Sequence, residues 1–282
     1  MKYLTHRGIK LPLVGIGSWF IGENPSKRGE EIASFLHGIE EYSMTLIDTA
    51  EMYGYGESEK LIAEVLKKKD REDLFIVDKI LPNNAEPGVF RRAFERSLRR
   101  LGTDYIDLYL LHWWTGQDLQ FVIDEMENLK SRGLIKEWGV ANFDVDEMEE
   151  LLACDGGENC FVNQVLYNIT SRGIEYDLIP YLKEHDILPM AYSPLANNMS
   201  LRRRFTMNSE VQKICKETGL SPEALMLSFV IRNGDIITAP KAGSRAHVDL
   251  NMKCLDFDIK PYMAKLDGSF PPPRYKMPLD IL

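Results

Sequence analysis

The stretch LIDTAEMYG, from Leu46 to Gly54, decides the fold prediction. An apolar run over residues 44–47 ends in the acid Asp48, and Tyr53 follows five residues later in a loop with glycines. Lys79 ends a second apolar run 31 residues after Asp48, and His112 ends a third run 33 residues after Lys79. Each step is about one strand plus one helix. The carboxyl ends of parallel strands meet on one face of a barrel, where such barrels keep their active sites. We therefore expect these four residues to meet there.

Composition limits the possible partners and the compartment. The chain has 282 residues and a formal net charge of −9, which disfavours nucleic acid and anionic membranes as partners. No apolar run approaches the ~20 residues of a membrane helix, and the N-terminus MKYLTHRGIKLP has no secretory apolar segment. Cys154, Cys160, Cys215 and Cys254 form neither a CxxC pair nor a zinc spacing. We expect a cytoplasmic protein with reduced thiols; the sequence makes no prediction of oligomeric state.

Strand-like and helix-like patterns alternate along the chain. The expected strands cover residues 13–19, 44–49, 73–79, 105–112, 135–142, 161–167, 187–193 and 235–241. Amphipathic helices are expected at 58–69, 89–102, 144–154 and 221–234; Asp144 and Glu147 suit a capping box. Eight strands alternating with helices, without a long linker, predict an α/β protein. Its fold would be a single (β/α)8 (TIM) barrel domain over residues 1–282.

Three segments lie outside this alternation. Residues 2–10 could form a small hairpin that closes the barrel floor, and residues 196–209 suggest a long loop with an extra helix. The proline-rich end, residues 270–282, should cross the surface without regular structure. A doubly wound open sheet is the alternative fold. It would show GxGxxG after its first strand, but Gly15 and Gly17 lie inside that strand and Gly22 comes too late.

The four strand-end residues form a chemically coherent set. A free tyrosine has a pKa near 10 and is a poor acid at neutral pH, but a nearby ammonium group lowers that value. Asp48 would compensate the buried charge of Lys79, and His112 could orient a carbonyl oxygen and share in proton transfer. Taken singly, Asp48 could be a helix cap and His112 a core histidine. Together they suggest that Tyr53 is the general acid of a carbonyl reduction.

With these residues in view, the chain resembles the aldo-keto reductase family from about residue 11 to residue 251. The segments GVANFD, FVNQVLYN, AYSPLA and TAPKAGS resemble the family's GVSNF, NQ-x-x-Y, Y-S-P-L-G and I-P-K motifs. That family is a (β/α)8 barrel that uses a nicotinamide cofactor without a Rossmann domain. Its Asp, Tyr, Lys and His tetrad falls on Asp48, Tyr53, Lys79 and His112.

The resemblance also implies cofactor and substrate contacts. Asn142 and Gln164 would bind the nicotinamide carboxamide, and Tyr192 would stack on the nicotinamide ring. The other implied cofactor contacts run from the nicotinamide end to the adenosine end and are Gly17, Ser18, Trp19, Ser193, Pro194, Leu195, Lys241, Ser244 and Asn251. Trp19, Trp113 and Trp114 would form the apolar walls of the substrate site.

Four positions depart from the family pattern. Ala141 and Ala196 replace a serine and a glycine, and Ala242 and His247 replace a hydroxyl residue and an arginine that help to hold the 2′-phosphate. Ser244 and Arg245 could compensate for the last two changes. Because Lys241 is retained, we expect NADPH to be favoured over NADH.

The resulting prediction is an NAD(P)H-dependent reductase of aldehyde and ketone carbonyls to alcohols. The partner is a small-molecule carbonyl substrate, and short loops around the pocket suggest broad tolerance. Two other functions stay open from the sequence. One is a nucleotide-binding regulatory or scaffold protein of the same fold with little turnover. The other is a metal-dependent barrel hydrolase, although the five histidines are isolated and no metal site is expected.

Overall fold

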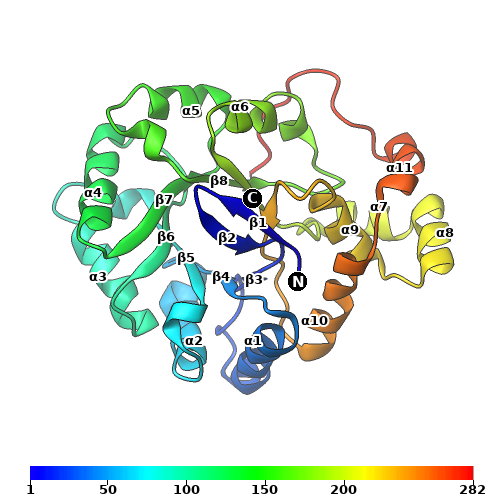
Figure 1. Cartoon of the computed structure of the whole chain (residues 1–282), viewed down its shortest axis with the longest axis horizontal. Coiled ribbons are helices and arrows are strands. Elements are labelled where there is room, and N and C mark those ends of the chain that lie inside the picture. The colour runs from blue at the N-terminus through cyan, green and yellow to red at the C-terminus, as the bar shows by residue number, and fades with distance from the viewer. Residues whose placement is uncertain (282) are drawn as a thin grey trace.

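The computed structural model describes residues 1–281; Leu282, the last residue of the predicted domain, lies outside them. Eight parallel strands form one sheet in the order β3 to β10. Their bounds are β3 Ile16–Gly17, β4 Leu46–Asp48, β5 Phe75–Ile80, β6 Ile106–Leu111, β7 Ile135–Ala141, β8 Val162–Leu166, β9 Leu188–Tyr192 and β10 Ile237–Thr238. The strands form a ring in Figure 1, with helices around it.

The first and last strands close the ring. Gly15 N donates to Thr238 O at 2.7 Å and Gly17 N donates to Pro240 O at 3.0 Å, so β3 lies beside β10. A Cβ atom on Gly17 would lie 2.4 Å from Ala239 O, which explains why the closure has glycine there. The predicted (β/α)8 barrel is confirmed, and the open-sheet alternative is wrong.

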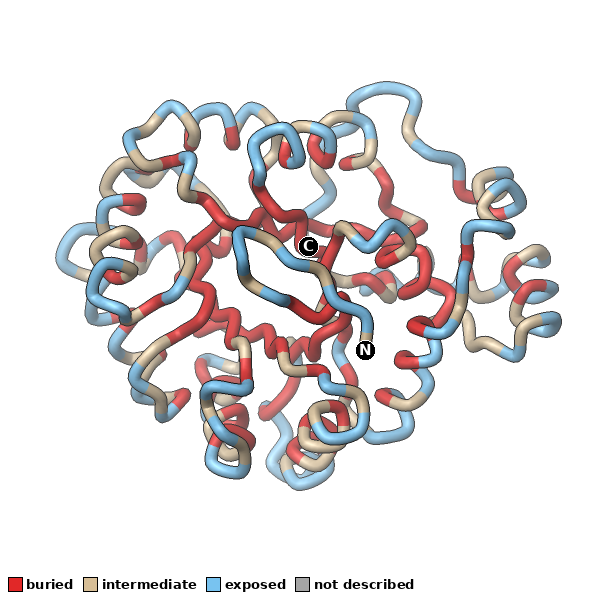
Figure 2. The backbone as a smooth tube through the Cα atoms, viewed as in Figure 1, coloured by how far each residue is buried: buried red, intermediate tan, exposed pale blue. Residues whose placement is uncertain are grey.

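Helices cover the outside of the barrel. Those that follow strands β3 to β8 are α1 Arg28–Tyr42, α2 Glu57–Leu66, α3 Phe90–Leu101, α4 Leu119–Ser131, α5 Val145–Leu152 and α6 Leu178–Glu184. The remaining helices are α7 Met199–Thr206, α8 Ser209–Thr218, α9 Pro222–Val230, α10 Arg245–Met252 and α11 Met263–Ser269. Buried backbone follows the strands and the inner faces of the helices in Figure 2, so the core lies within and just outside the ring.

Local signals explain several helix ends. Asp144 and Glu147 form the predicted capping box at the start of α5, and Gly102 ends α3 in the left-handed conformation. The helix predicted to reach Gly234 ends at Val230, because residues 231–234 form a tight turn with Gly234 N bonded to Ile231 O at 3.0 Å.

The hairpin β1 (Tyr3–His6) and β2 (Ile9–Pro12) lies across the ring in Figure 1. Arg7 donates to Asp186 Oδ2 and to Asn159 O, in the loops that precede β9 and β8, so the hairpin closes the amino end of the barrel as predicted. The extra helix predicted within residues 196–209 is α7, and residues 271–281 have no helix or strand, also as predicted. No helix among the described residues is long and apolar enough to cross a membrane.

Candidate active site

The predicted tetrad residues meet at the carboxyl ends of neighbouring strands. Asp48 is the last residue of β4, Lys79 lies near the end of β5, and His112 directly follows β6. Tyr53 begins a short 3-10 turn, Tyr53–Gly56, between β4 and α2. The parallel register of β4, β5 and β6 therefore brings together residues that are about thirty positions apart in the chain.

Lys79 connects the other members of this group. Its ammonium donates to Asp48 Oδ1 at 2.7 Å, to Thr49 O at 2.8 Å and to the Tyr53 hydroxyl oxygen at 3.3 Å. The lysine is 0% exposed, so its charge depends on these three acceptors. Burial alone lowers the pKa of Lys79, but Asp48 and Tyr53 outweigh that effect and the net pKa is raised. The residue is a permanent cation at physiological pH.

The loop that carries Tyr53 turns tightly. Gly54 and Tyr55 have φ values of 56° and 55°, and Gly56 has a φ of 93°, so three consecutive residues adopt left-handed conformations. Glycine adopts this conformation at little cost, whereas Tyr55 does so as an exposed residue at the tip of the turn. The turn leaves Tyr53 buried while α2 begins at Glu57.

Aromatic rings surround the Tyr53 phenol. The His112 ring lies edge-on with its centroid 5.9 Å from that of Tyr53, and the Trp19 ring stacks at 6.3 Å. Burial raises the pKa of Tyr53 to about 12, against the lowering effect of Lys79. Lys79 lowers the pKa of Tyr53, as the sequence predicted, but the predicted lowering of the net pKa of Tyr53 is wrong. The phenol is protonated at neutral pH and can donate a hydrogen bond.

His112 is held as a neutral imidazole. Burial, and then the charge of Lys79, hold the pKa of His112 well below its usual value. Its Nδ1 atom is buried and has no hydrogen-bond partner among residues 1–281. A neutral ring beside a buried ammonium can interact with an oxygen atom without adding a second positive charge.

A cavity of about 640 Å³ opens next to this group. It runs from the Tyr53 loop, past the end of β9, to helix α10. The predicted site residues that line it are Gly17, Trp19, Asp48, Tyr53, Tyr192, Ser193, Pro194, Leu195, Lys241, Ser244 and Asn251. Most of the predicted cofactor residues therefore share one cavity with two members of the tetrad.

Three other predicted cofactor residues do not line the cavity and contact the tetrad or its neighbours. Gln164 Nε2 donates to Asp48 Oδ1 at 2.8 Å, and Ser18 Oγ donates to Asp48 O at 2.8 Å. Asn142 Nδ2 donates to His112 O at 3.0 Å, and Asn142 Oδ1 accepts from the Tyr192 hydroxyl at 2.7 Å. These contacts fix the positions of the strand ends around the site.

The two tryptophans after β6 also lie outside the cavity. The Trp113 ring is 4.8 Å from the His112 ring. Trp114 stacks on Phe143 at 6.2 Å and donates its indole N–H to Gln117 O at 2.8 Å. Trp113 is therefore next to the tetrad, whereas Trp114 packs against the loop after β7.

The cavity has charged lining residues that the sequence reading did not select. They are Lys27, Glu30, Glu31, Arg202 and Glu223, joined by His247, which had been noted only as a departure. Arg202 lies on α7 and pairs with Glu223 at 2.9 Å, 21 residues away. No sequence spacing links α7 to the start of α9, so only the fold could reveal this pair.

Comparison with known proteins identifies the family. The model of the aldo/keto reductase family matches residues 13–266. The chain is 42% identical over 275 residues to the methylglyoxal reductase YeaE of Escherichia coli (strain K12), covering 97% of this chain and 96% of that protein. It is 28% identical to the NADH-specific methylglyoxal reductase of the same strain, with 89% and 93% covered.

A solved structure agrees with these matches. The crystal structure of an aldo-keto reductase from Klebsiella pneumoniae in complex with NADPH is 39% identical, with a TM-score of 0.95 and 100% of both chains covered. This chain therefore belongs to the aldo/keto reductase family. It is a nicotinamide-dependent oxidoreductase that reduces aldehyde and ketone carbonyls to alcohols. The regulatory or scaffold alternative finds no support in these relatives.

Proposed function

We propose that this enzyme reduces small neutral carbonyl compounds, and that 2-oxoaldehydes such as methylglyoxal are its first substrate class. The name of the E. coli relative at 42% identity supports the class. The observation that carries the chemistry is the position of Lys79 Nζ, 2.7 Å from Asp48 and 3.3 Å from the Tyr53 hydroxyl oxygen. Asp48 and Tyr53 also line the cavity, so a substrate in the cavity can reach the phenol.

In this proposal Tyr53 is the general acid. The reduced nicotinamide, when bound, supplies the hydride to the carbonyl carbon. Tyr53 donates its phenolic proton to the carbonyl oxygen as negative charge develops there. Lys79 stabilises the resulting phenolate, and Asp48 keeps the lysine charged and oriented. His112, held neutral, orients the carbonyl oxygen next to the phenol.

The cavity lining supports a dinucleotide as the cofactor. Of the lining residues, Tyr192 would stack on the nicotinamide ring, with Gly17 and Trp19 alongside it. Asn142, Gln164 and Ser18 do not line the cavity but are bonded to its lining residues Tyr192 and Asp48; Asn142 and Gln164 would hold the carboxamide, and Ser18 would lie alongside the ring. Ser193, Pro194 and Leu195 would follow the pyrophosphate, where Ser193 has a φ of 47° and turns the chain sharply after β9. Lys241, Ser244 and Asn251 would hold the adenosine end, where the cavity reaches α10.

We propose NADPH as the preferred cofactor. Lys241 is an exposed residue; desolvation is the largest cause that lowers its pKa, Glu31 and Glu23 act against it, and Lys27 adds to the lowering. The ammonium groups of Lys27 and Lys241 both line the cavity and favour an anionic group there, as the 2′-phosphate would be. Glu30 and Glu31 line the same cavity and oppose this preference.

Binding measurements on the natural protein and one variant test this preference. The dissociation constants of NADPH and NADH should be compared for the natural protein and for Lys241→Met. Loss of one charge-assisted contact should weaken the binding of NADPH by about tenfold and the binding of NADH much less. An equal loss of affinity for both cofactors would show that Lys241 does not bind the 2′-phosphate.

A matched pair of substrates tests the substrate class. Methylglyoxal and pyruvate have similar size, but pyruvate carries a carboxylate. Lys79, the cation next to Tyr53, is buried and already paired, so pyruvate should have a kcat/KM lower by about tenfold or more. Oxidation of the reduced nicotinamide is followed by absorbance. If neutral aldehydes are not reduced while NADPH binds normally, the proposal is wrong.

We also propose that the chain acts as one barrel domain in the cytoplasm. The family match covers residues 13–266. All four cysteines are free thiols, which agrees with a reducing compartment.

A further inference from the structure

Glu51 lies inside the tyrosine loop but takes no part in the chemistry proposed above. It sits between Asp48 and Tyr53 in the chain, and it is 6% exposed. It does not line the cavity. Its Oε1 atom accepts from Leu81 N at 2.8 Å and from Asn84 Nδ2 at 2.9 Å. Both donors follow β5, the strand that carries Lys79.

The backbone on either side of Glu51 is bonded to the same strand. Thr49 N donates to Val77 O at 2.8 Å, and Glu51 N donates to Lys79 O at 3.3 Å. Thr49 O accepts from the Lys79 ammonium at 2.8 Å. Residues 49–51 therefore continue the pairing of β4 with β5 beyond the end of the strand. The Glu51 carboxylate makes the last contact with the β5 side before the chain turns to Tyr53.

Burying a carboxylate is unfavourable in free energy. Removing it from water costs several kcal/mol unless hydrogen bonds and an opposite charge replace the water. Glu51 has two hydrogen bonds, and its Oε2 atom lies 3.8 Å from Arg96 on α3. An apolar residue would fill the same space without that cost. The carboxylate is thus best explained by the connection that it makes between the two segments.

We propose that Glu51 is a positioning residue, whose carboxylate fixes the tyrosine loop to the end of β5 and so holds the Tyr53 hydroxyl at 3.3 Å from Lys79. The inference rests on the proposed role of Tyr53. A shift of about 1 Å in a reacting group can lower the rate by about a hundredfold, so loss of this connection should reduce turnover. Cofactor affinity should not change, since Glu51 does not reach the cavity.

Asp107 provides a matched control. It is buried like Glu51; its Oδ2 atom accepts from a backbone N–H of β5, Ile76 N at 2.9 Å, and it pairs with Arg71 and Lys136, both at 2.7 Å. It lies near the start of β6, at the opposite end of the barrel from Tyr53. Glu51→Ala and Asp107→Ala therefore remove similar buried contacts of β5, one close to the phenol and one far from it.

The experiment compares kcat, the Kd of NADPH and the unfolding temperature for these two variants and for Glu51→Gln. Glu51→Ala should lower kcat by about ten- to a hundredfold with the NADPH Kd unchanged, and Glu51→Gln, which keeps the accepting oxygen, should recover most of kcat. Asp107→Ala should lower the unfolding temperature and leave kcat within about twofold at a temperature where it is folded. Should Glu51→Ala not fold, Glu51→Leu fills the space without an acceptor and tests the same point.

Three results would overturn the inference: an unchanged kcat in folded Glu51→Ala or Glu51→Leu, a kcat in Glu51→Gln no better than in Glu51→Ala, or a parallel loss of NADPH affinity. Tyr53→Phe, measured alongside, separates this inference from the proposed function. If Tyr53→Phe retains activity, the role of Tyr53 is wrong; if it is inactive while Glu51→Ala is fully active, only the role of Glu51 is wrong.

Discussion

Two buried tyrosines of this protein have the same kinds of neighbour but differ in the hydrogen bonds of their hydroxyl groups. Tyr53 lies 3.3 Å from the Lys79 ammonium, which is paired with Asp48. Tyr167, directly after β8, lies 2.7 Å from Arg232, which is paired with Glu175. Burial is the largest cause that raises the pKa of each phenol, to about 12 for Tyr53 and further for Tyr167.

The two hydroxyl groups differ in where their protons go. Tyr167 accepts from Arg232 and donates to Glu175 Oε1 at 2.6 Å, so its proton is already in a hydrogen bond. Tyr53 accepts from Lys79, and no acceptor for its own proton is found among residues 1–281. A buried phenol next to a cation and a carboxylate is not sufficient for a general acid. The phenol must also have its proton free for a substrate oxygen.

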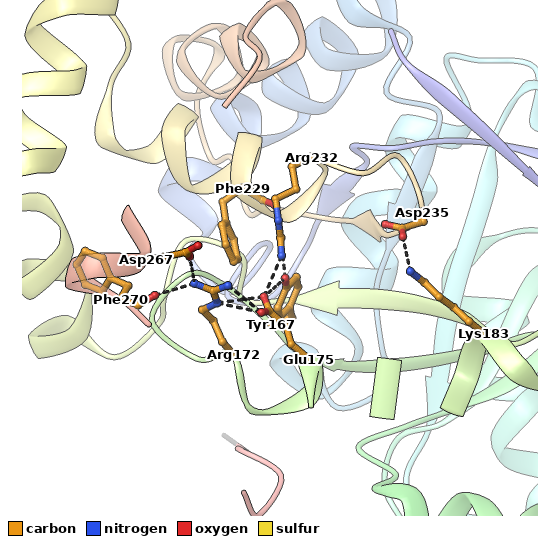
Figure 3. Close-up of polar contacts among 9 residues, drawn as sticks. All are labelled: Tyr167, Arg172, Glu175, Lys183, Phe229, Arg232, Asp235, Asp267 and Phe270. Atoms are coloured by element: carbon orange, nitrogen blue, oxygen red, sulfur yellow. Dashed lines mark hydrogen bonds and ion pairs between the residues drawn. The ribbon is translucent and has the colours of Figure 1, made fainter. Parts of the chain in front are cut away.

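Tyr167, Arg172, Glu175 and Arg232 form a cluster, the Tyr167 cluster, that holds the C-terminal part of the chain. Figure 3 shows Arg172 at its centre, with Glu175 on one side and Asp267 and Phe270 on the other. Arg172 Nη1 donates to Asp267 Oδ1 and to Phe270 O, both at 2.7 Å, and so ties the end of α11 to the loop after β8. We expect changes in this cluster to affect stability and changes around Tyr53 to affect turnover.

Tyr53→Phe should show the largest effect in this comparison. Loss of the phenolic proton removes the proposed general acid and should lower kcat for carbonyl reduction by about 10²–10⁴-fold. The NADPH Kd should change little, because the ring and its packing remain. Steady-state kinetics with methylglyoxal and a fluorescence titration with NADPH measure both. Retention of more than a tenth of the natural kcat would contradict the role of Tyr53.

Arg172→Met should have the largest effect on stability. It leaves the carboxylates of Glu175 and Asp267 short of a partner in a largely buried site, which should lower the free energy of unfolding by about 3–5 kcal/mol. Activity per folded molecule should stay within about twofold, since Arg172 lies outside the cavity. Urea unfolding and kinetics on the same sample check the prediction. A large loss of kcat with little loss of stability would reverse the assignment of the two clusters.

The sequence predicted the Tyr53 region and not the Tyr167 cluster, for a physical reason. Asp48, Lys79 and His112 recur once per βα unit, and the parallel barrel turns that spacing into proximity. Arg172 and Asp267 are 95 residues apart and Arg232 and Glu175 are 57 apart, across helices of different length. No repeat in the sequence relates such positions, so their contact depends on how α9 and α11 pack.

Burial explains why the sequence predicted the effect of the lysine on the pKa of Tyr53 but not the net pKa of that phenol. The lysine beside Tyr53 could be predicted, because its effect on the phenol is local. The net pKa could not be predicted, because it depends on how completely Trp19, His112 and the barrel strands exclude water. The capping box at Asp144 and Glu147 was predictable for the opposite reason, since both residues lie within one helical turn.

Tyr167→Phe, the counterpart of Tyr53→Phe, should have a smaller effect of a different kind. The change removes one hydroxyl and leaves Arg232 and Glu175 each without one partner, which should lower the free energy of unfolding by about 1–3 kcal/mol. Turnover should stay within about twofold. Kinetics and urea unfolding of the two tyrosine variants, measured side by side, compare the proposed proton donor with a phenol expected to act only in stability. Equal losses of kcat in the two variants would remove the distinction.

The smallest effect is expected in the pH dependence of reduction. The proposed mechanism needs Tyr53 protonated, and because burial raises its pKa to about 12, the donor form is lost only as pH rises toward that value. At the acid side, burial and Lys79 hold the pKa of His112 well below its usual value, so the ring stays neutral as pH falls through 6.5. The kcat for methylglyoxal should therefore vary little between about pH 6 and pH 9. A steep fall in kcat between about pH 7 and pH 8 would mean that Lys79 outweighs burial during the reaction. The pKa of Tyr53 would then be lowered, as the sequence alone predicts from the neighbouring lysine. The difference between Tyr53 and Tyr167 would lie more in the charges next to each phenol than in which group accepts each hydroxyl proton.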